Sequence, residues 1–297
     1  MKYMHSEWRD RLENWIHALA QDLYLPLGPL PVEAFETAER LSPAQAAGRR
    51  FAPLAEGSPW GDGYAYCWMR GSVTLPEAAK GKRIVLDLPT GGETSVFVDG
   101  LSFGTYRASG MDEPHHYLVD NALTRDGQPG RRYDILLEAY AGHYFPQRPL
   151  AACATGPVLP GSYQDPLAGK KRSMLGRLSF GIWNEEAYQL YLDLKTLWLL
   201  CCEQDPESLR ADKLAKALEQ ATLLLDFEQP PEGRLQGYRA ARALLAPLLA
   251  AHNGSTAPRF YAIGNAHLDL AWLWTMEETY RKTSRTFAAQ LRLLEEY

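Results

Sequence analysis

The spacing of apolar residues predicts a helix at the start of the chain, followed by irregular structure. Apolar side chains recur every three or four positions at Trp8, Leu12, Trp15, Ile16, Leu19 and Leu23. This spacing predicts an amphipathic helix over residues 5–23, because it places these side chains on one helical face. Prolines at positions 26, 29, 31, 43, 53 and 59 then predict largely irregular chain over residues 24–63. Residues 1–63 are therefore interpreted as an amino-terminal helix and a wrapping segment.

From residue 64 onward the apolar period changes to two. Tyr66 and Trp68 alternate with Cys67 and Met69, and further apolar runs occupy residues 83–88, 94–98 and 133–140. Alternation of this kind is typical of strands with two different faces. The dipeptide Asp99-Gly100 after one of these runs predicts a hairpin turn. Residues 64–142 are therefore predicted to form a β-sandwich of the jelly-roll or galactose-binding-like kind.

Helical patterns return after a Pro- and Gly-rich linker at residues 143–182. Asn184 is a suitable cap for a helix with an apolar face, and Asp205-Pro206 suggests the start of a second one. A third helix is predicted over residues 234–250, bent or shortened by Pro247. Residues 183–258 are interpreted as a helical spacer, and the whole chain as a multidomain α+β protein.

The last stretch carries the residues with the clearest chemistry. A short apolar strand is predicted at Phe260–Gly264, and His267 and Asp269 follow it. In extended chain these two side chains point the same way, and imidazole and carboxylate both ligate zinc. A loop histidine beside a carboxylate that caps the next helix is the alternative. A final helix is predicted from about Met276, with one apolar side formed by Tyr280, Phe287, Leu291 and Leu294.

The amino-acid sequence around His267 strongly resembles that of a known protein family. The run from Gly264 to Trp274, with Glu278 and residues 285–287 and 291–297, resembles the start of the catalytic domain of glycoside hydrolase family 38 α-mannosidases. The likeness is closest to the bacterial and cytosolic type and covers about the last forty residues. It implies that residues 259–297 are the first β/α unit of an incomplete β/α barrel.

The resemblance also implies an activity and its residues. His267 and Asp269 match two of the family's metal ligands, and Trp272 matches a tryptophan that stacks on the cleaved sugar. The expected reaction is metal-dependent, retaining hydrolysis of terminal α-D-mannosyl residues of oligosaccharides, with zinc as the expected metal and cobalt as the alternative. The family's nucleophile, acid/base and remaining histidine ligand lie beyond the equivalent of Tyr297. No catalytic residue is therefore expected within this chain, which alone should be inactive and should bind metal weakly.

Two neighbouring acids in the final helix do not replace the missing pair. Glu277 and Glu278 are adjacent on a helix, so their side chains diverge by about 100° and cannot flank one glycosidic bond. Both lie in the first turn, where the helix dipole favours acids. The apolar surface of residues 260–297 predicts self-association, as in a homo-oligomer, or a mobile tail.

Composition excludes several classes of protein. A net charge of −5 argues against a nucleic-acid binder, and no apolar run approaches the ~20 residues of a membrane span. The first residues lack the apolar core of a signal peptide. The four cysteines, Cys67, Cys153, Cys201 and Cys202, show no disulfide framework, which predicts a cytoplasmic location.

Two other functions compete with the mannosidase. A metal-dependent carbohydrate deacetylase is disfavoured because no His-x-His or Asp-Asp pair lies near the predicted strand. A non-catalytic sugar-binding sandwich would bind mannosides through residues 64–142 without metal. An aromatic patch at Trp60 and Tyr64 could face sugar, although packing in the core is at least as good an interpretation. The acidic and histidine-rich run at residues 112–116 is interpreted as an exposed loop.

Overall fold

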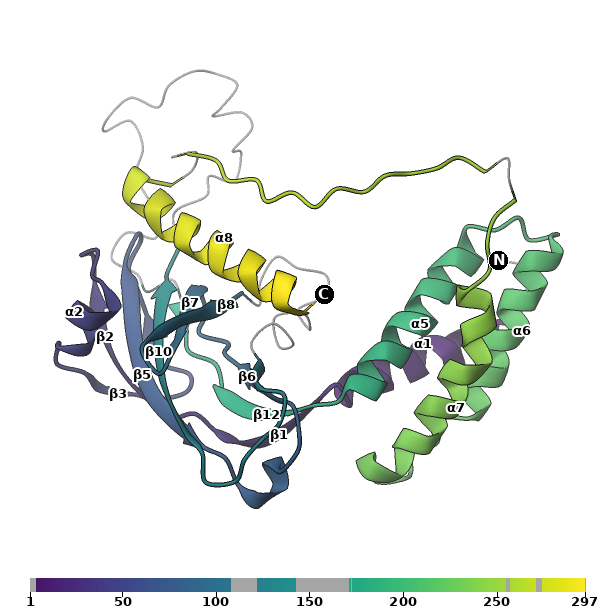
Figure 1. Cartoon of the computed structure of the whole chain (residues 1–297), viewed down its shortest axis with the longest axis horizontal. Coiled ribbons are helices and arrows are strands. Elements are labelled where there is room, and N and C mark those ends of the chain that lie inside the picture. The colour runs from purple at the N-terminus through teal and green to yellow at the C-terminus, as the bar shows by residue number, and fades with distance from the viewer. Residues whose placement is uncertain are drawn as a thin grey trace. The chain divides into compact units, whose positions relative to one another are not determined.

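Four helices and part of a connecting segment make up one of two structural units. The computed structural model describes residues 4–107, 122–142, 171, 173–254, 257–270 and 274–296. One unit contains Met1–Leu25 and Trp183–Ile263, and the other contains Pro26–Ile182 and Gly264–Tyr297. The helices of the first unit are α1 (Ser6–Gln21), α5 (Glu185–Cys202), α6 (Leu209–Leu223) and α7 (Pro231–Leu249), shown in Figure 1. None of the helices in the described residues is long and apolar enough to cross a membrane.

The predicted helices are confirmed, with corrected starts for α6 and α7. Helix α7 begins at Pro231, three residues before the predicted start, and continues through Pro247 to Leu249. The Asn184 side chain caps α5 by accepting a hydrogen bond from the amide of Ala187 at 3.3 Å. Helix α6, however, begins after Ser208 and not after Asp205, because the Ser208 side chain accepts from the amide of Ala211 at 3.1 Å. Asp205 instead accepts from the amide of Glu207 at 3.0 Å, which closes a turn before the helix.

A buried acid joins α1 to α7. Asp22 follows α1, and both of its carboxylate oxygens lie 2.7 Å from Nη1 of Arg234. The hydroxyl of Tyr238 donates to the same carboxylate. Arg234 also donates to the carbonyl of Phe227 at 2.9 Å. Burial, and then the hydrogen bond to Asp22, raise the pKa of Tyr238 above its ordinary value. This cluster ties the first helix to residues more than 200 positions away.

The second unit is built on two larger sheets and a small one. The six-stranded sheet has the order β3-β2-β5-β10-β7-β8, the four-stranded sheet β1-β12-β6-β9, and the third sheet pairs β11 with β4. The strands are β1 (Tyr24–Pro29), β2 (Val32–Thr37), β3 (Ala52–Leu54), β4 (Pro59–Trp60), β5 (Tyr66–Thr74), β6 (Ile84–Asp87), β7 (Glu93–Val98), β8 (Leu101–Tyr106), β9 (Ala122–Thr124), β10 (Arg132–Tyr140), β11 (Ser173–Met174) and β12 (Ser179–Trp183). Short helices α2 (Pro43–Ala47) and η1 (Glu77–Ala79) lie between strands in the chain.

The alternating pattern forms the core of this unit as predicted. Inward-facing side chains of the two large sheets make one buried cluster, to which Trp60 of β4 also belongs; the cluster includes Cys67, Met69, Val73, Ile84, Leu86, Val96, Ile135 and Leu137. The predicted Asp99-Gly100 turn joins β7 to β8, with φ of 51° and 82°, as the tight hairpin requires. Trp60 belongs to the core and donates its indole N–H to the carbonyl of Thr90 at 2.7 Å. Tyr64 is exposed whereas Trp60 is fully buried, so the packing interpretation holds for Trp60.

Residues 24–63 and 143–182 contain more structure than their composition predicted. Strands β1, β2, β3 and β4 and helix α2 fall in the first range, and β11 and most of β12 in the second. The prolines of residues 24–63 predict irregular chain, but β1 and β3 are edge strands and β4 pairs with β11 alone among the described strands. A missing N–H is tolerated at an edge because it faces away from the ladder. The division into five domains itself stays a prediction.

The carboxyl-terminal residues contain one long helix and no strand among those described. Helix α8 (Met276–Glu296) begins where the sequence predicted it. Residues 260–264 were predicted to form a strand, but they have no strand partner, and Phe260 and Ile263 are each 90% exposed. A strand needs a neighbour for its backbone N–H and C=O groups, and apolar composition alone does not provide one. Helix α8 crosses the six-stranded sheet (Figure 1).

Candidate metal ligands and the helix that follows them

His267 and Asp269 lie next to each other in the segment that leads to α8. Nε2 of His267 and Oδ1 of Asp269 are 2.9 Å apart, within hydrogen-bonding distance. The side chains are 75% and 44% exposed. The prediction that the two groups point the same way is therefore confirmed, and both donor atoms are open to solvent.

The separation of these two atoms suits a shared divalent cation. Two ligands on a tetrahedral zinc with bonds of about 2.0–2.1 Å lie about 3.3 Å apart, so a small side-chain adjustment from 2.9 Å is enough. In the described part of the chain, no group of three or more His, Cys, Asp or Glu residues could hold a metal. Zinc sites use three or four protein ligands, so these two side chains alone do not make a complete zinc site.

Several candidate residues fall outside the described part of the chain. Trp272, the expected sugar-stacking residue, is one of them, as are Cys153 and the run at residues 112–116. The nearby Trp274 is described, and its indole N–H donates to Oγ1 of Thr279 at 3.1 Å. The ammonium of Lys282 lies 4.5 Å from the centroid of the same ring. Trp274 is thereby fixed to the first turns of α8.

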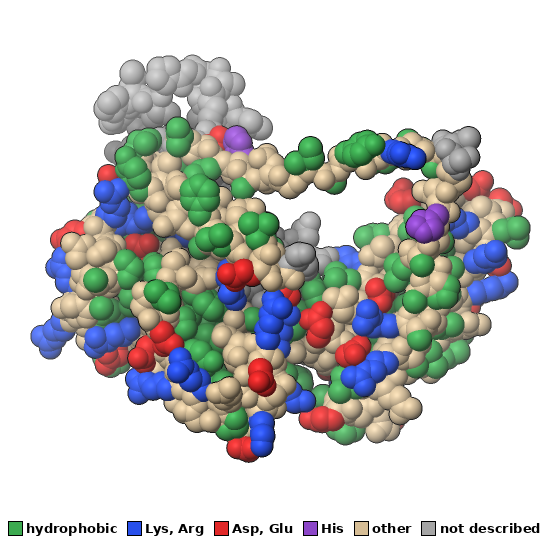
Figure 2. Space-filling model, viewed as in Figure 1, with side chains coloured by type: hydrophobic (Ala, Val, Ile, Leu, Met, Phe, Trp, Pro, Cys, Tyr) green, Lys and Arg blue, Asp and Glu red, His purple; other side chains and the backbone are tan. Residues whose placement is uncertain are grey.

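Helix α8 is amphipathic, but its polar side is the buried one. The buried residues of this helix are Glu278, Thr279, Arg281 and Arg285. Its apolar side, predicted to carry Tyr280, Phe287, Leu291 and Leu294, is exposed, and hydrophobic side chains gather over the helix in Figure 2. The expected exposure of apolar surface in this region is confirmed, and the sandwich holds α8 through charge and hydrogen bonding.

Glu278 is the most deeply buried acid of this contact. It is fully buried and accepts a hydrogen bond of 2.5 Å from the hydroxyl of Tyr66 and another from Arg285. Burial, and then the charge of Glu278, raise the pKa of Tyr66 above its ordinary value. Glu277 is exposed and lies 3.3 Å from Arg40. The two adjacent acids therefore occupy different environments, which agrees with their rejection as a catalytic pair.

A second buried ion pair lies beside the first. Nε of Arg281 donates to Oε1 of Glu138 at 2.9 Å, and both side chains are at least nine-tenths buried. The guanidinium of Arg281 also lies over the ring of Tyr66, 3.6 Å from its centroid, and its Nη2 donates to the carbonyl of Glu39 at 2.9 Å. Burial raises the pKa of Glu138, and the hydrogen bond from Arg281 opposes that rise.

Three cationic side chains lie near the carboxylate of Glu93 on β7. Lys282 lies 2.7 Å away, Arg285 3.3 Å and Arg107 3.5 Å. Burial alone would raise the pKa of Glu93, but Arg285, Lys282 and Arg107 together hold it below its ordinary value. The carboxylate is therefore stabilised in its charged form.

This lowered pKa predicts a pH-dependent contribution to stability. A carboxylate with a depressed folded pKa stabilises the fold above its unfolded pKa, about 4.3, and loses that contribution as the pH falls through the folded value. Glu93→Gln should therefore cost about 1.5–3 kcal/mol of unfolding free energy at pH 7. We expect the difference from the unsubstituted protein to shrink below pH ~4.3, as measured by urea unfolding between pH 3 and pH 7.

The exposed Glu77, 4.0 Å from Lys80, provides the matched control. Glu77→Gln should change the unfolding free energy by less than about 0.5 kcal/mol at every pH. A Glu93→Gln penalty that stays constant down to pH 3 would contradict the role given to the three cations.

Sequence reasoning missed this polar contact, although a signal was present. Residues 278, 281, 282 and 285 share one face of α8, because they are spaced by three and four positions. Glu138 also interrupts the apolar run at residues 135–140. An acid inside a buried strand and a basic stripe on a nearby helix together indicate an ion pair, since buried charges are rarely left unpaired.

Comparison with known proteins gives one match in each of the two chain segments that form the second unit. Residues 28–157 match the family model "Alpha-mannosidase, jelly roll domain", and residues 257–297 match "Glycosyl hydrolases family 38 N-terminal domain". Among curated proteins, human alpha-mannosidase 2C1 is 26% identical over 264 residues, which cover 89% of this chain and 24% of that protein. Alpha-mannosidase G of Dictyostelium discoideum is 21% identical over 81% of this chain and 20% of its own length.

The similarity to a solved structure is weaker than the similarity to the curated proteins. A β-glucuronidase from Faecalibacterium prausnitzii aligns with 55% of this chain and 32% of its own, at 15% identity and a TM-score of 0.29. The chain spans about a quarter of the length of the curated human relative. The two family matches and the curated relatives show that this chain is similar to the amino-terminal portion of glycoside hydrolase family 38 α-mannosidases.

Proposed function

We propose that this chain is part of a metal-dependent, retaining α-mannosidase that hydrolyses terminal α-D-mannosyl residues of oligosaccharides. The observation that carries the proposal is the His267–Asp269 pair, whose donor atoms lie 2.9 Å apart. The pair falls inside the segment that matches the family 38 amino-terminal domain. The curated relatives, which are named as alpha-mannosidases, support the same substrate class.

In this proposal the chain contributes ligands and a sugar contact. Nε2 of His267 and Oδ1 of Asp269 would hold the cation, with zinc expected and cobalt as the alternative. When bound, such a metal polarises oxygen atoms of the substrate as a Lewis acid. Trp272 would stack on the mannose ring, because aromatic faces cover the apolar side of a sugar. The nucleophile and the acid/base would come from residues other than those of this chain.

Assembly and location remain predictions of the same kind. The exposed apolar side of α8 supports self-association of the isolated chain, because contiguous apolar surface favours contact with a partner. Cys67 and Cys201 are buried free thiols, which is compatible with the proposed cytoplasmic location.

The proposal is tested by hydrolysis of a chromogenic α-mannoside by the uninterrupted natural gene product. We expect activity that is abolished by a chelator and restored by zinc or cobalt. His267→Ala and Asp269→Ala should each reduce kcat/KM by more than about 100-fold, since even outer-shell changes cost 10–100-fold. The 297-residue chain alone should be inactive.

His252→Ala is the matched control, because this histidine is exposed in a segment outside the matched family 38 region. It should leave activity unchanged. Hydrolysis that survives both the chelator and Asp269→Ala would refute the metal role. Absence of activity on any α-mannoside would reject the mannosidase and turn attention to acetylated glycans.

A further inference from the structure

The outer face of the six-stranded sheet is covered in two places by other elements. Helix α8 lies over Tyr66 and Glu138, as its hydrogen bonds show. Around α2, Ala46 and Phe51 form a small apolar cluster with Trp68. Farther along the same face, the side chains of Arg70 on β5 and of Arg132 and Asp134 on β10 are exposed.

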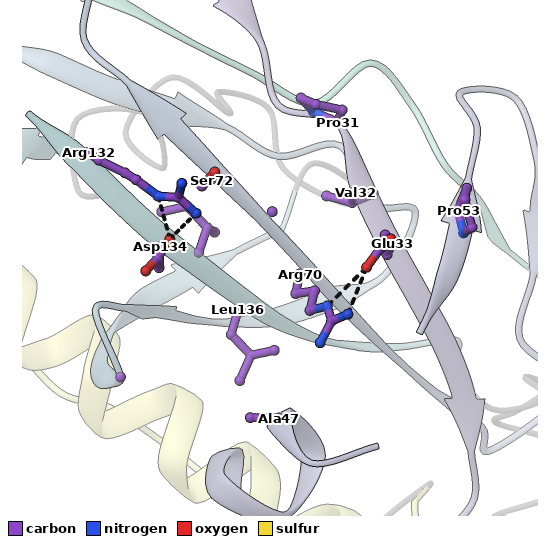
Figure 3. A pocket seen from close by; sticks show the side chains of 13 residues that line it. Pro31, Val32, Glu33, Ala47, Pro53, Arg70, Ser72, Arg132, Asp134 and Leu136 are labelled. Atoms are coloured by element: carbon purple, nitrogen blue, oxygen red, sulfur yellow. Dashed lines mark hydrogen bonds and ion pairs between the residues drawn. The ribbon is translucent and has the colours of Figure 1, made fainter. Parts of the chain in front are cut away.

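Strand register places a defined set of side chains in this exposed area. Glu33 of β2 is opposite Arg70 of β5, which is opposite Leu136 of β10. Two residues along, and therefore on the same face, Ser72 is opposite Asp134. These residues line a groove of about 660 Å³ (Figure 3). Its size is within the range of sites for small molecules.

Two complete ion pairs line the groove. Nη2 of Arg70 lies 2.8 Å from Oε2 of Glu33, and Nε of Arg70 lies 3.1 Å from the same oxygen. Arg132 bonds Asp134 with Nε 3.0 Å from Oδ1. Figure 3 shows the two pairs as separate groups with the Leu136 side chain nearby. Because each positive charge has its negative partner, the groove carries no net charge from these side chains and favours neither an anion nor a cation.

The polar groups are held in place over apolar surface. The guanidinium of Arg70 lies 4.2 Å from the centroid of the Phe51 ring, which fixes its plane. Pro31, Val32, Pro53, Ala47 and Leu136 provide the apolar lining. The side chains of Arg70 and Glu33 are about half exposed and those of Arg132 and Asp134 about two-thirds exposed, so they retain donors and acceptors for a ligand.

The strand pairing argues against a peptide as the occupant. A bound extended peptide usually adds to the edge of a sheet, where main-chain groups are unpaired. Here β5 is paired on both sides, with β2 and β10, and β10 is paired with β5 and β7. The backbone of β5 and β10 below the groove therefore has no row of free groups to offer a peptide. The edge strand β3 is only three residues long, and its Pro53 has no N–H to donate. Recognition by side chains is therefore favoured.

The geometry points to a second, metal-independent binding site for a neutral oligosaccharide in this groove. A sugar has hydroxyls that donate to carboxylates and accept from guanidinium groups, and C–H faces that match an apolar lining. It also has no net charge. The choice of a mannose-containing glycan rests on the proposed function, whereas the class of neutral glycan rests on the groove. The site would hold a part of the substrate, or a neighbouring glycan chain, away from His267 and Asp269.

The test is titration of α-linked mannotriose into the isotopically labelled 297-residue chain, followed by NMR in the presence of a chelator. Shifts should concentrate at residues 70–72 and 132–136 and should persist in His267→Ala. Ser72→Trp fills the groove, and Arg132→Gln with Asp134→Asn removes one ion pair. Each change should weaken binding about ten- to hundredfold, as expected for loss of charged hydrogen bonds or of the site itself.

Arg131→Gln is the matched control, because Arg131 pairs with Asp99 and does not line the groove. Thermal unfolding of each variant verifies that the sandwich is intact. Binding that disappears with the chelator or in His267→Ala would assign the sugar to the metal site and overturn the inference. Binding unaffected by Ser72→Trp, or absent for mannotriose and for other neutral trisaccharides, would also overturn it. Loss of activity in the hydrolysis assay above would leave this test unchanged, so the two proposals fail separately.

Discussion

Replacing Arg281 with methionine should lower the unfolding free energy of the sandwich unit by about 3–5 kcal/mol, the usual cost of breaking a buried ion pair. The substitution leaves the buried carboxylate of Glu138 without the hydrogen bond that Arg281 donates at 2.9 Å. It also removes the cation above the ring of Tyr66. Because Arg281 opposes the rise in the pKa of Glu138, that pKa should rise further in the variant. The loss of stability should then become smaller as the pH falls and Glu138 takes up a proton.

Two control variants distinguish the effect of breaking the Arg281–Glu138 ion pair from the effect of losing the packing of a side chain. The double variant Arg281→Met with Glu138→Leu removes both charges and should recover much of the stability, since apolar replacement of a whole buried pair is often neutral. Arg40→Met removes an exposed partner of Glu277 and should cost less than about 1 kcal/mol. Urea unfolding followed by tryptophan fluorescence gives all three values. A double variant as unstable as the single one would show that the charges themselves hold α8 to the sandwich.

Asp22→Ala should destabilise the helical unit by about 3 kcal/mol or more, because it leaves a mostly buried cation and a buried hydroxyl without their acceptor. Arg234 would lose both oxygens at 2.7 Å, and Tyr238 would lose the acceptor of its hydroxyl. The pKa of Tyr238, which Asp22 helps to raise, should fall toward its ordinary value. Circular dichroism during thermal unfolding measures the first effect, and ultraviolet titration of tyrosine the second.

Asp10 provides the comparison for Asp22 within the same helix. It is largely exposed and lies 3.6 Å from Arg9, so Asp10→Ala should change stability by less than about 0.5 kcal/mol. Equal effects of the two substitutions would mean that the Asp22 cluster contributes nothing beyond an exposed pair.

The sequence was sufficient to predict helices and strands whose own apolar spacing reveals them. Helix α1, helix α8 and strand β10 follow from the spacing of apolar residues, because that spacing reflects which side of an element is covered. Strands β1 and β3 were not predicted, since their prolines are tolerated only at a sheet edge and strand order is not visible in a sequence. The strand predicted at residues 260–264 is wrong, because an apolar run alone does not supply the neighbouring strand that a β-strand needs.

The candidate site also has features that the sequence predicts and features that it does not. His267 and Asp269 were found by their spacing and by the resemblance of the residues around them, and their proximity is a local property of the chain. The contact of Glu278 with Tyr66 joins residues 212 positions apart and depends on how α8 lies across the sheet. The pattern of α8 predicted two faces correctly, but it could not tell which one the sandwich would cover.

The two units are both interrupted in sequence, and this has a consequence for synthesis on the ribosome. Residues 26–182 separate α1 from the helices it packs against. At a translation rate of ~5–20 residues per second, α1 waits roughly 8 to 30 s before its partners emerge. During that interval its apolar stripe is available to a chaperone. The sandwich, in turn, receives α8 only after the whole helical unit has been made, so the buried ion pairs of α8 cannot form until that unit has left the ribosome.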